Sequence, residues 1–125
     1  MKAHYQGVHH LALVTRDMEK SLYFYRDILG FDLVERFFDE GENAEIVFLS
    51  LGNTLLELLA PEDPQAFQSP AGFHLALGVR AVDQVFALLQ EKGIPVLLPL
   101  TESGGYRYAY FSGPMGEVVE IVERV

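Results

Sequence analysis

Two histidines and two glutamates of this chain stand in repeated sequence contexts that suit a metal ion. The tetrapeptide His-Leu-Ala-Leu begins at His10 and again at His74, 64 positions later. A glutamate interrupts an apolar run at Glu57, within LLELL, and 63 positions later at Glu120, within VVEIV. A carboxylate taken out of water without a partner is strongly penalised. Because neither run contains a lysine or arginine, we expect a cation to lie beside both glutamates.

The residue types indicate which metals these four side chains would hold. Two imidazoles and two carboxylates form a borderline-hard ligand set, which is typical of sites for Zn, Ni, Co, Mn or Fe. Taken singly, each residue is more often an ordinary strand residue, but equivalent placement in two repeats favours a metal site. Strand alternation puts His9 on the face opposite His10, and His4 lies near the chain end, so we assign neither as a ligand.

The elements that must position these side chains follow the same order in both halves. Each histidine strand is followed by a helical pattern, which Asp17 caps and Gly30 ends in the first half and Gly93 ends in the second. Three apolar runs separated by turns then follow, at 31–38, 45–51 and 54–60 and at 96–100, 106–112 and 117–123. We therefore predict an α+β fold of two βαβββ modules, about residues 5–60 and 73–125, joined by a linker at 61–72 within one domain spanning 1–125.

Alternation along the strands also predicts what surrounds the four side chains. The histidines share faces with small residues that leave space beside them, and the same surface would be lined by Ile46, Phe48, Leu55 and Leu59. This lining favours a small, partly apolar substrate. Tyr106, Tyr108 and Tyr110 share one strand face, where packing is a more frequent role than substrate binding. Two arginines are candidates for binding a substrate carboxylate, although surface arginines are commoner: Arg36 and Arg107.

Composition limits the other classes of function. The 125 residues carry a formal net charge of −9, which repels phosphate backbones and anionic lipid, so neither nucleic acid nor a membrane is an expected partner. The chain has no cysteine, which excludes thiolate metal sites and thiol nucleophiles. No apolar run is long enough to span a bilayer, and the first residues contain no signal-peptide core, so we expect a cytoplasmic protein.

The order of these motifs resembles a known family. The stretch VHHLALVTRDMEKSLYFYRDILGF is similar to the opening of the vicinal oxygen chelate superfamily, which has the glyoxalase I, bleomycin resistance protein and dioxygenase fold. LLELLAP, FHLALGV and GPMGEVVEIVE resemble its later signature segments, so the resemblance covers essentially the whole chain. It implies a curved eight-stranded mixed sheet with a divalent metal in a concave cleft. Carried over by position, the implied metal ligands are His10, Glu57, His74 and Glu120.

This ligand set is most similar to that of glyoxalase I. The resemblance implies a metal-dependent lyase or isomerase that transfers a proton next to a carbonyl through a metal-stabilised enediolate, with Glu120, or alternatively Glu57, as the base. Bacterial glyoxalase I members commonly carry Arg and Asn at two glutathione-binding positions, where this chain has Val14 and Pro61, which weighs against glutathione use. An acyl-CoA epimerase resembling methylmalonyl-CoA epimerase and a metal-free binding protein of the bleomycin-resistance kind remain alternatives. The expected partners are a small carbonyl substrate and a second copy of the chain.

Overall fold

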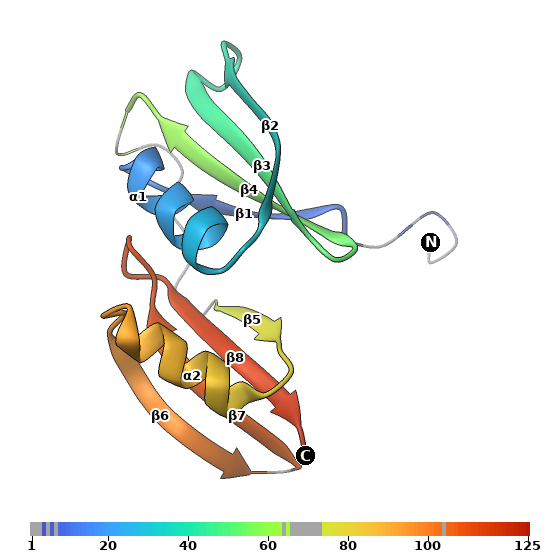
Figure 1. Ribbon diagram of the computed structural model, residues 1–125. Coiled ribbons are helices and arrows are strands. Elements are labelled where there is room, and N and C mark those ends of the chain that lie inside the picture. Colours follow the sequence, from blue (N-terminus) through green and yellow to red (C-terminus); the bar gives the residue numbers. More distant parts are fainter. Residues whose placement is uncertain (1–3, 5, 7, 64, 66–73, 104) are drawn as a thin grey trace. The chain divides into compact units, whose positions relative to one another are not determined.

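The chain forms two compact units, Met1–Ser69 and Pro70–Val125, in a computed structural model that describes residues 4, 6, 8–63, 65, 74–103 and 105–125 (Figure 1). The first unit contains β1 (His10–Val14), α1 (Met18–Leu22), the π-helix η2 (Tyr23–Ile28), β2 (Asp32–Asp39), β3 (Ala44–Leu51) and β4 (Thr54–Pro61). The second contains β5 (Leu75–Gly78), α2 (Val82–Glu91), β6 (Val96–Ser103), β7 (Tyr106–Ser112) and β8 (Val118–Arg124). Both units therefore follow the predicted βαβββ order.

Each unit has its own four-stranded mixed sheet. The strand orders are β1-β4-β3-β2 and β5-β8-β7-β6. In each sheet the histidine-bearing edge pairs in parallel with the glutamate strand, β1 with β4 and β5 with β8, and the other neighbours are antiparallel. The predicted α+β class is confirmed, and the eight strands are present as two hydrogen-bonded sheets of four. Pro61 closes β4, whereas residues 64 and 66–72 of the predicted linker lie outside the described residues.

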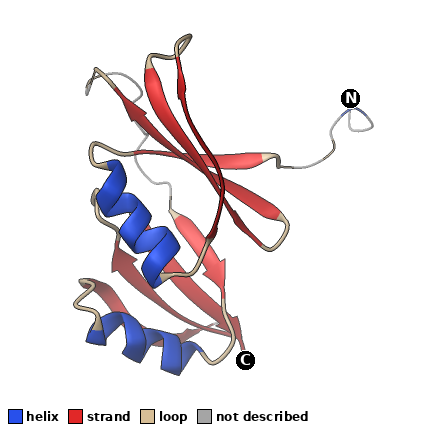
Figure 2. Cartoon of the chain, turned by 45° about the horizontal axis from the view of Figure 1, so that its top comes forward, coloured by secondary structure: helices blue, strands red, loops and turns tan. Residues whose placement is uncertain are grey.

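One face of each sheet is covered by the helix of the same unit (Figure 2). On the helix side, alternate strand residues are apolar and fully buried, because burial of this face supplies most of the stabilisation of a small unit. In the first unit these strand residues are Val47, Leu49, Leu56 and Leu58. In the second they are Ala109, Phe111, Val119 and Ile121. The glutamates occupy the intervening strand positions and so point to the other face of each sheet.

The first helix begins and ends where the sequence predicts, but it changes character along its length. The Asp17 carboxylate accepts a hydrogen bond from the Lys20 backbone N–H at 3.1 Å, as a helix N-cap does. Gly30 has a φ of 84°, the left-handed conformation that ends the helix. Between them the turn widens into η2, where the Leu29 N–H donates to the Phe24 carbonyl at 2.9 Å. Apolar periodicity alone did not distinguish this π-helix from an α-helix.

The second helix begins in a way that the sequence analysis did not foresee. Ala81, at its N-cap, has a φ of 53°, and its own side chain caps nothing. Instead, the Glu123 carboxylate of β8 accepts hydrogen bonds from the Ala81 and Val82 backbone N–H groups, both at 3.0 Å. A distant strand therefore supplies the cap. None of the described helices has the length and apolar character needed to cross a bilayer.

Candidate functional site

In the first unit, His10 and Glu57 lie on neighbouring parallel strands. The pairing of β1 with β4 sets Ala12 level with Glu57, so that His10 lies two residues before the glutamate level on the same face. The His10 Nε2 atom and the Glu57 Oε1 atom are 3.9 Å apart. This distance is too long for a hydrogen bond but close enough for an electrostatic interaction.

The second unit repeats this arrangement with a closer contact. The register of β5 with β8 sets Ala76 level with Glu120, and His74 directly precedes β5. His74 Nε2 lies 2.9 Å from Glu120 Oε1, which is hydrogen-bonding distance. Only about a seventh of each glutamate side chain is exposed, 14% for Glu57 and 15% for Glu120. The structure thus contains two equivalent His–Glu pairs, as the repeat predicts within each half.

The surroundings of Glu57 are apolar. Phe48 lies directly across from it on β3, and the His10 ring packs edge-on against the Phe48 ring with centroids 5.6 Å apart. The same face continues into a small apolar cluster of Ala44, Ile46 and Leu59, with Val14 packed against it. Burial in this environment raises the pKa of Glu57, His10 lowers it, and the negative charges of Glu42 and Asp39 raise it further.

The surroundings of Glu120 carry hydroxyl groups instead. Tyr110 lies across from Glu120 on β7, with its ring centroid 5.6 Å from that of His74. Tyr108 continues the row, 5.9 Å from Tyr110. Tyr106, at the end of the stripe, is exposed, and the Arg124 guanidinium lies over its ring. The predicted tyrosine stripe therefore shares the face of the second His–Glu pair.

The donor distances within each pair can be compared with what a divalent ion requires. Two N or O donors that each bind an ion at about 2.1 Å lie about 3.0 Å apart in octahedral geometry and about 3.4 Å apart in tetrahedral geometry. The His74–Glu120 distance of 2.9 Å is close to the first value, whereas the His10–Glu57 distance of 3.9 Å exceeds both. Among the described residues, no group of three or more His, Cys, Asp or Glu side chains is arranged to hold a metal. Each unit therefore brings one histidine and one glutamate together.

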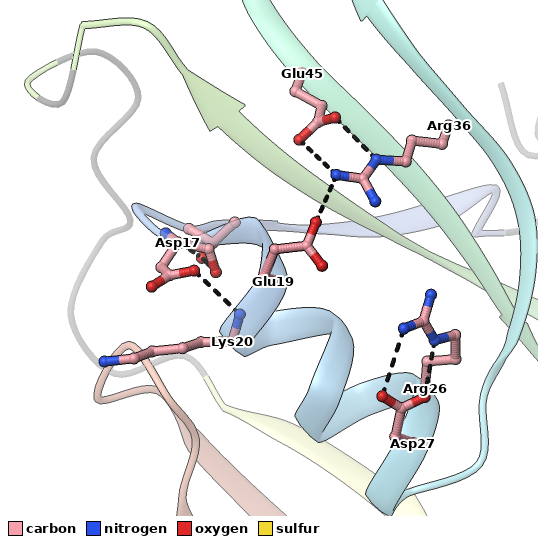
Figure 3. A network of polar contacts seen from close by, with 8 residues as sticks. Asp17, Glu19, Lys20, Arg26, Asp27, Arg36 and Glu45 are labelled. Carbon is pink, nitrogen blue, oxygen red and sulfur yellow. Dashed lines mark hydrogen bonds and ion pairs between the residues drawn. The ribbon is translucent and has the colours of Figure 1, made fainter.

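The two arginines considered as substrate-binding residues are engaged elsewhere. Arg36 binds Glu45 at 2.9 Å and Glu19 of α1 at 2.8 Å (Figure 3). Arg107 forms an ion pair with Asp83 of α2. Both guanidinium groups thus link the sheet to the helix of their own unit, on the face opposite the glutamates. The interpretation as surface arginines is supported for both.

One polar contact of the site was missed by the sequence analysis. The Nδ1 atoms of His9 and His10 are 2.9 Å apart, and the two rings meet edge to face. Alternation placed His9 on the opposite face, but β1 begins only at His10, so the rule does not apply to the residue before it. The adjacent histidines in the sequence were the signal from which this contact could have been predicted.

Comparisons with known proteins give one matching family and several relatives. Residues 7–121 match the family described as Glyoxalase/Bleomycin resistance protein/Dioxygenase superfamily. The uncharacterised protein YwkD of Bacillus subtilis is 34% identical over 95% of this chain and 98% of its own length. Glyoxylase I 4 of Arabidopsis thaliana is 26% identical over 94% of this chain and 71% of its own. Bovine mitochondrial methylmalonyl-CoA epimerase is 30% identical over 79% of this chain and 61% of its own.

The solved structures share the fold. The fosfomycin resistance protein FosX of Listeria monocytogenes, in complex with Mn(II) and sulfate, superposes with a TM-score of 0.74. The match covers 97% of this chain and 94% of FosX at 15% sequence identity. Identity this low relates the two proteins by fold alone.

Proposed function

This chain belongs to the Glyoxalase/Bleomycin resistance protein/Dioxygenase superfamily, and from that premise we propose that it is a divalent-metal-dependent lyase or isomerase. The reaction moves a proton next to a substrate carbonyl, as in glyoxalase I. The four metal ligands are His10, Glu57, His74 and Glu120, and the active protein is a homodimer in the cytoplasm. A relative named Glyoxylase I 4 supports this type of activity, and the ion in FosX supports a metal in this fold.

The observation that carries the proposal is the repetition of one His–Glu pair at equivalent strand positions in both units. Each glutamate side chain is mostly buried and lies next to an imidazole, with a small alanine level with it on the neighbouring strand. Two buried carboxylates of this kind require compensation by positive charge. A metal shared by both pairs provides it, and two imidazoles plus two carboxylates suit Zn, Ni, Co, Mn or Fe.

The chemistry that follows divides between the ion and the chain. When bound, the ion would act as a Lewis acid for the negative charge that develops on the substrate carbonyl oxygen. The imidazoles of His10 and His74 would bind the ion as ligands. Glu120 is our first assignment for the group that accepts the proton, and Glu57 is the alternative. The apolar residues that share the face of Glu57, Phe48 among them, would limit the access of water to one side of the reacting centre.

Metal content tests the ligand assignment. We expect protein purified without added metal to contain about one divalent ion per set of four ligands, measured by elemental analysis. His10→Ala and Glu120→Gln are expected to lower the content, whereas the matched variants His4→Ala and Glu91→Gln, both at exposed positions, are expected to retain it. Unchanged metal content in His10→Ala and Glu120→Gln would make the assignment wrong.

A proton-exchange assay tests the reaction and the base. We expect either hemithioacetal isomerisation or deuterium exchange next to the carbonyl of a small substrate. With bound metal restored, the variant that lacks the base should lose at least about a hundredfold in kcat, the lower end of what general-base catalysis supplies. Comparing Glu120→Gln with Glu57→Gln at equal metal content identifies the base. Absence of exchange on every carbonyl substrate would refute the enzymatic proposal.

An acyl-CoA epimerase is the second candidate. The observation in its favour is that Val14 and Pro61 occupy the positions at which the resemblance to bacterial glyoxalase I would place glutathione-binding Arg and Asn. In the structure Pro61 is the last residue of β4, and Val14 packs against the apolar cluster beside Glu57. The methylmalonyl-CoA epimerase relative points in the same direction. Exchange of the α-proton of a branched acyl-CoA, without hemithioacetal turnover, would favour this candidate.

The same experiments separate the third class, a metal-free binding protein. Tight binding of a drug such as bleomycin, together with no bound ion, would favour sequestration over catalysis.

Co-expression of the His10→Ala and His74→Ala variants tests whether the ligands of one metal ion come from one chain or from two. Recovery of part of the metal content in the mixture would mean that the ligands of one ion come from two chains. Recovery of none would mean that a single chain supplies them.

A further inference from the structure

The contact between His9 and His10 defines which ring nitrogen of His10 is available. The Nδ1 atoms of the two rings lie 2.9 Å apart, so one of them carries the hydrogen and donates it to the other. The other nitrogen of His10, Nε2, is directed toward Glu57, 3.9 Å away, beyond hydrogen-bonding distance. The two nitrogens of His10 therefore face two different partners.

A neutral imidazole has one donor nitrogen and one acceptor nitrogen, and only the acceptor can bind a metal. If His10 donates its Nδ1 hydrogen to His9, its Nε2 lone pair is free and lies on the Glu57 side. If His9 donates instead, the hydrogen of His10 is on Nε2, which then cannot be a ligand. The identity of the acceptor in the His9–His10 contact thus decides whether His10 can bind an ion.

We propose that His9 is a positioning residue that accepts the Nδ1 hydrogen of His10 and so presents His10 Nε2 to the metal. This inference rests on the proposed function, because it assumes that His10 is a ligand. Partners on the second nitrogen of a ligand histidine commonly fix its tautomer and ring orientation. The His10 ring is held on another side by the edge-on contact with Phe48, so His9 and Phe48 together set its direction.

The sequence of the second half has no histidine at the equivalent position. The residue that precedes His74 is Phe73, which has no ring nitrogen. His74 instead brings its Nε2 directly to Glu120 at 2.9 Å. His9 therefore belongs to the first pair alone, the pair whose donor atoms are farther apart.

Three substitutions at one position test the role of His9. His9→Phe removes the acceptor and reproduces the sequence of the second half. His9→Asn keeps an acceptor, because the amide oxygen occupies the place of Nδ1, whereas the longer His9→Gln places its amide near the position of Nε2. We expect His9→Phe and His9→Gln to bind zinc about tenfold or more weakly and His9→Asn to bind within about threefold of the unaltered protein. Chelator competition measures the three affinities.

A second readout separates this role from a merely structural one. In the zinc-loaded protein, ¹⁵N-edited NMR of the imidazoles should show His10 protonated at Nδ1 and the Nδ1 of His9 unprotonated. Equal zinc affinity of His9→Phe and His9→Asn, or an unprotonated Nδ1 on His10, would overturn the inference. If the unaltered protein binds no zinc or other divalent ion, the proposed function fails first. If it binds an ion and His9→Phe binds equally well, only the role of His9 is refuted.

Discussion

The two units are alike on their helix sides and unlike on the opposite faces. On the helix sides, buried aliphatic residues occupy matching places, Leu56 and Leu58 on β4 and Val119 and Ile121 on β8. On the other faces, Phe48 lies across from Glu57, whereas Tyr110 lies across from Glu120. The two units are thus alike in their cores and differ on the faces that carry the His–Glu pairs.

This difference places two identical acids in different environments. Glu57 lies across from Phe48 beside a buried apolar cluster and 3.9 Å from His10, and burial raises its pKa. Glu120 Oε1 lies 2.9 Å from His74 Nε2, on the face that carries a row of tyrosines. Carboxylates in contrasting environments are commonly the ones that take different roles in proton transfer.

The largest effect is expected from the shared cores. Leu58→Ala and Ile121→Ala each remove a side chain that is at most 1% exposed, and each should lower the free energy of unfolding by about 2–5 kcal/mol. Urea denaturation followed by circular dichroism measures both losses. A large loss for one variant and almost none for the other would show that the two helix-side cores are not equivalent.

The helix caps should differ between the units. Asp17→Ala removes one local hydrogen bond to Lys20 N and should cost about 1 kcal/mol. Glu123→Ala removes the acceptor of two backbone N–H groups and should cost more, about 2–3 kcal/mol. Glu91→Ala, at the exposed end of α2, is the matched control for loss of a charge. An equal cost for Asp17→Ala and Glu123→Ala would argue against capping from a distant strand.

The pH dependence of stability should separate the two glutamates. Because the folded-state pKa of Glu57 is raised, its contribution is most favourable below the ordinary glutamate pKa and is lost as the pH rises through the folded value. In metal-free protein, Glu57→Gln should therefore raise the Tm at pH 7, and the gain should shrink toward about pH 4. Glu120→Gln should give no such gain, since it weakens the contact with His74. The same rise in Tm at pH 7 for Glu57→Gln and Glu120→Gln would contradict the difference between the environments of the two glutamates.

The smallest effect is expected from the arginines that join helix and sheet. Arg36→Ala breaks contacts with Glu45 and Glu19, and Arg107→Ala breaks one with Asp83. Because all of these groups are partly exposed, each change should cost about 1 kcal/mol or less and should fade at high salt. Neither change should alter the KM of a carboxylate-bearing substrate. A large increase in KM for either variant would indicate that the substituted arginine binds the substrate.

Much of this architecture could be predicted from the sequence because the repeat doubles each local signal. A single Asp17 or Gly30 is a weak indication of a helix end, but a strand, a helix and three apolar runs in the same order twice leave few alternatives. The same doubling picked out the four metal-ligand candidates. Within each unit, the structure brings the predicted histidine and glutamate to the same face.

What the sequence did not reveal depends on contacts between distant segments or on exact strand ends. Glu123 caps a helix that begins 41 residues earlier, at Val82. No local sequence pattern predicts a capping residue so far along the chain. The role of His9 depends on β1 beginning at His10 and not before it. The turn predicted at 101–105 begins later, because β6 continues to Ser103 with shifts in its pairing to β7. Propensity does not determine such extensions.

The π-helix η2 explains why the helical segment of the first half is one residue longer than that of the second half. Gly30 follows Asp17 by 13 positions, whereas Gly93 follows Ala81 by only 12, yet each glutamate lies 27 positions beyond its glycine. The surplus residue of the first half thus falls inside the helix, where a π-turn accommodates it. In a regular α-helix one additional residue would rotate all that follows by about 100°. The π-helix therefore accommodates the additional residue within the helix, so that the strands after it keep the same alignment as in the second half.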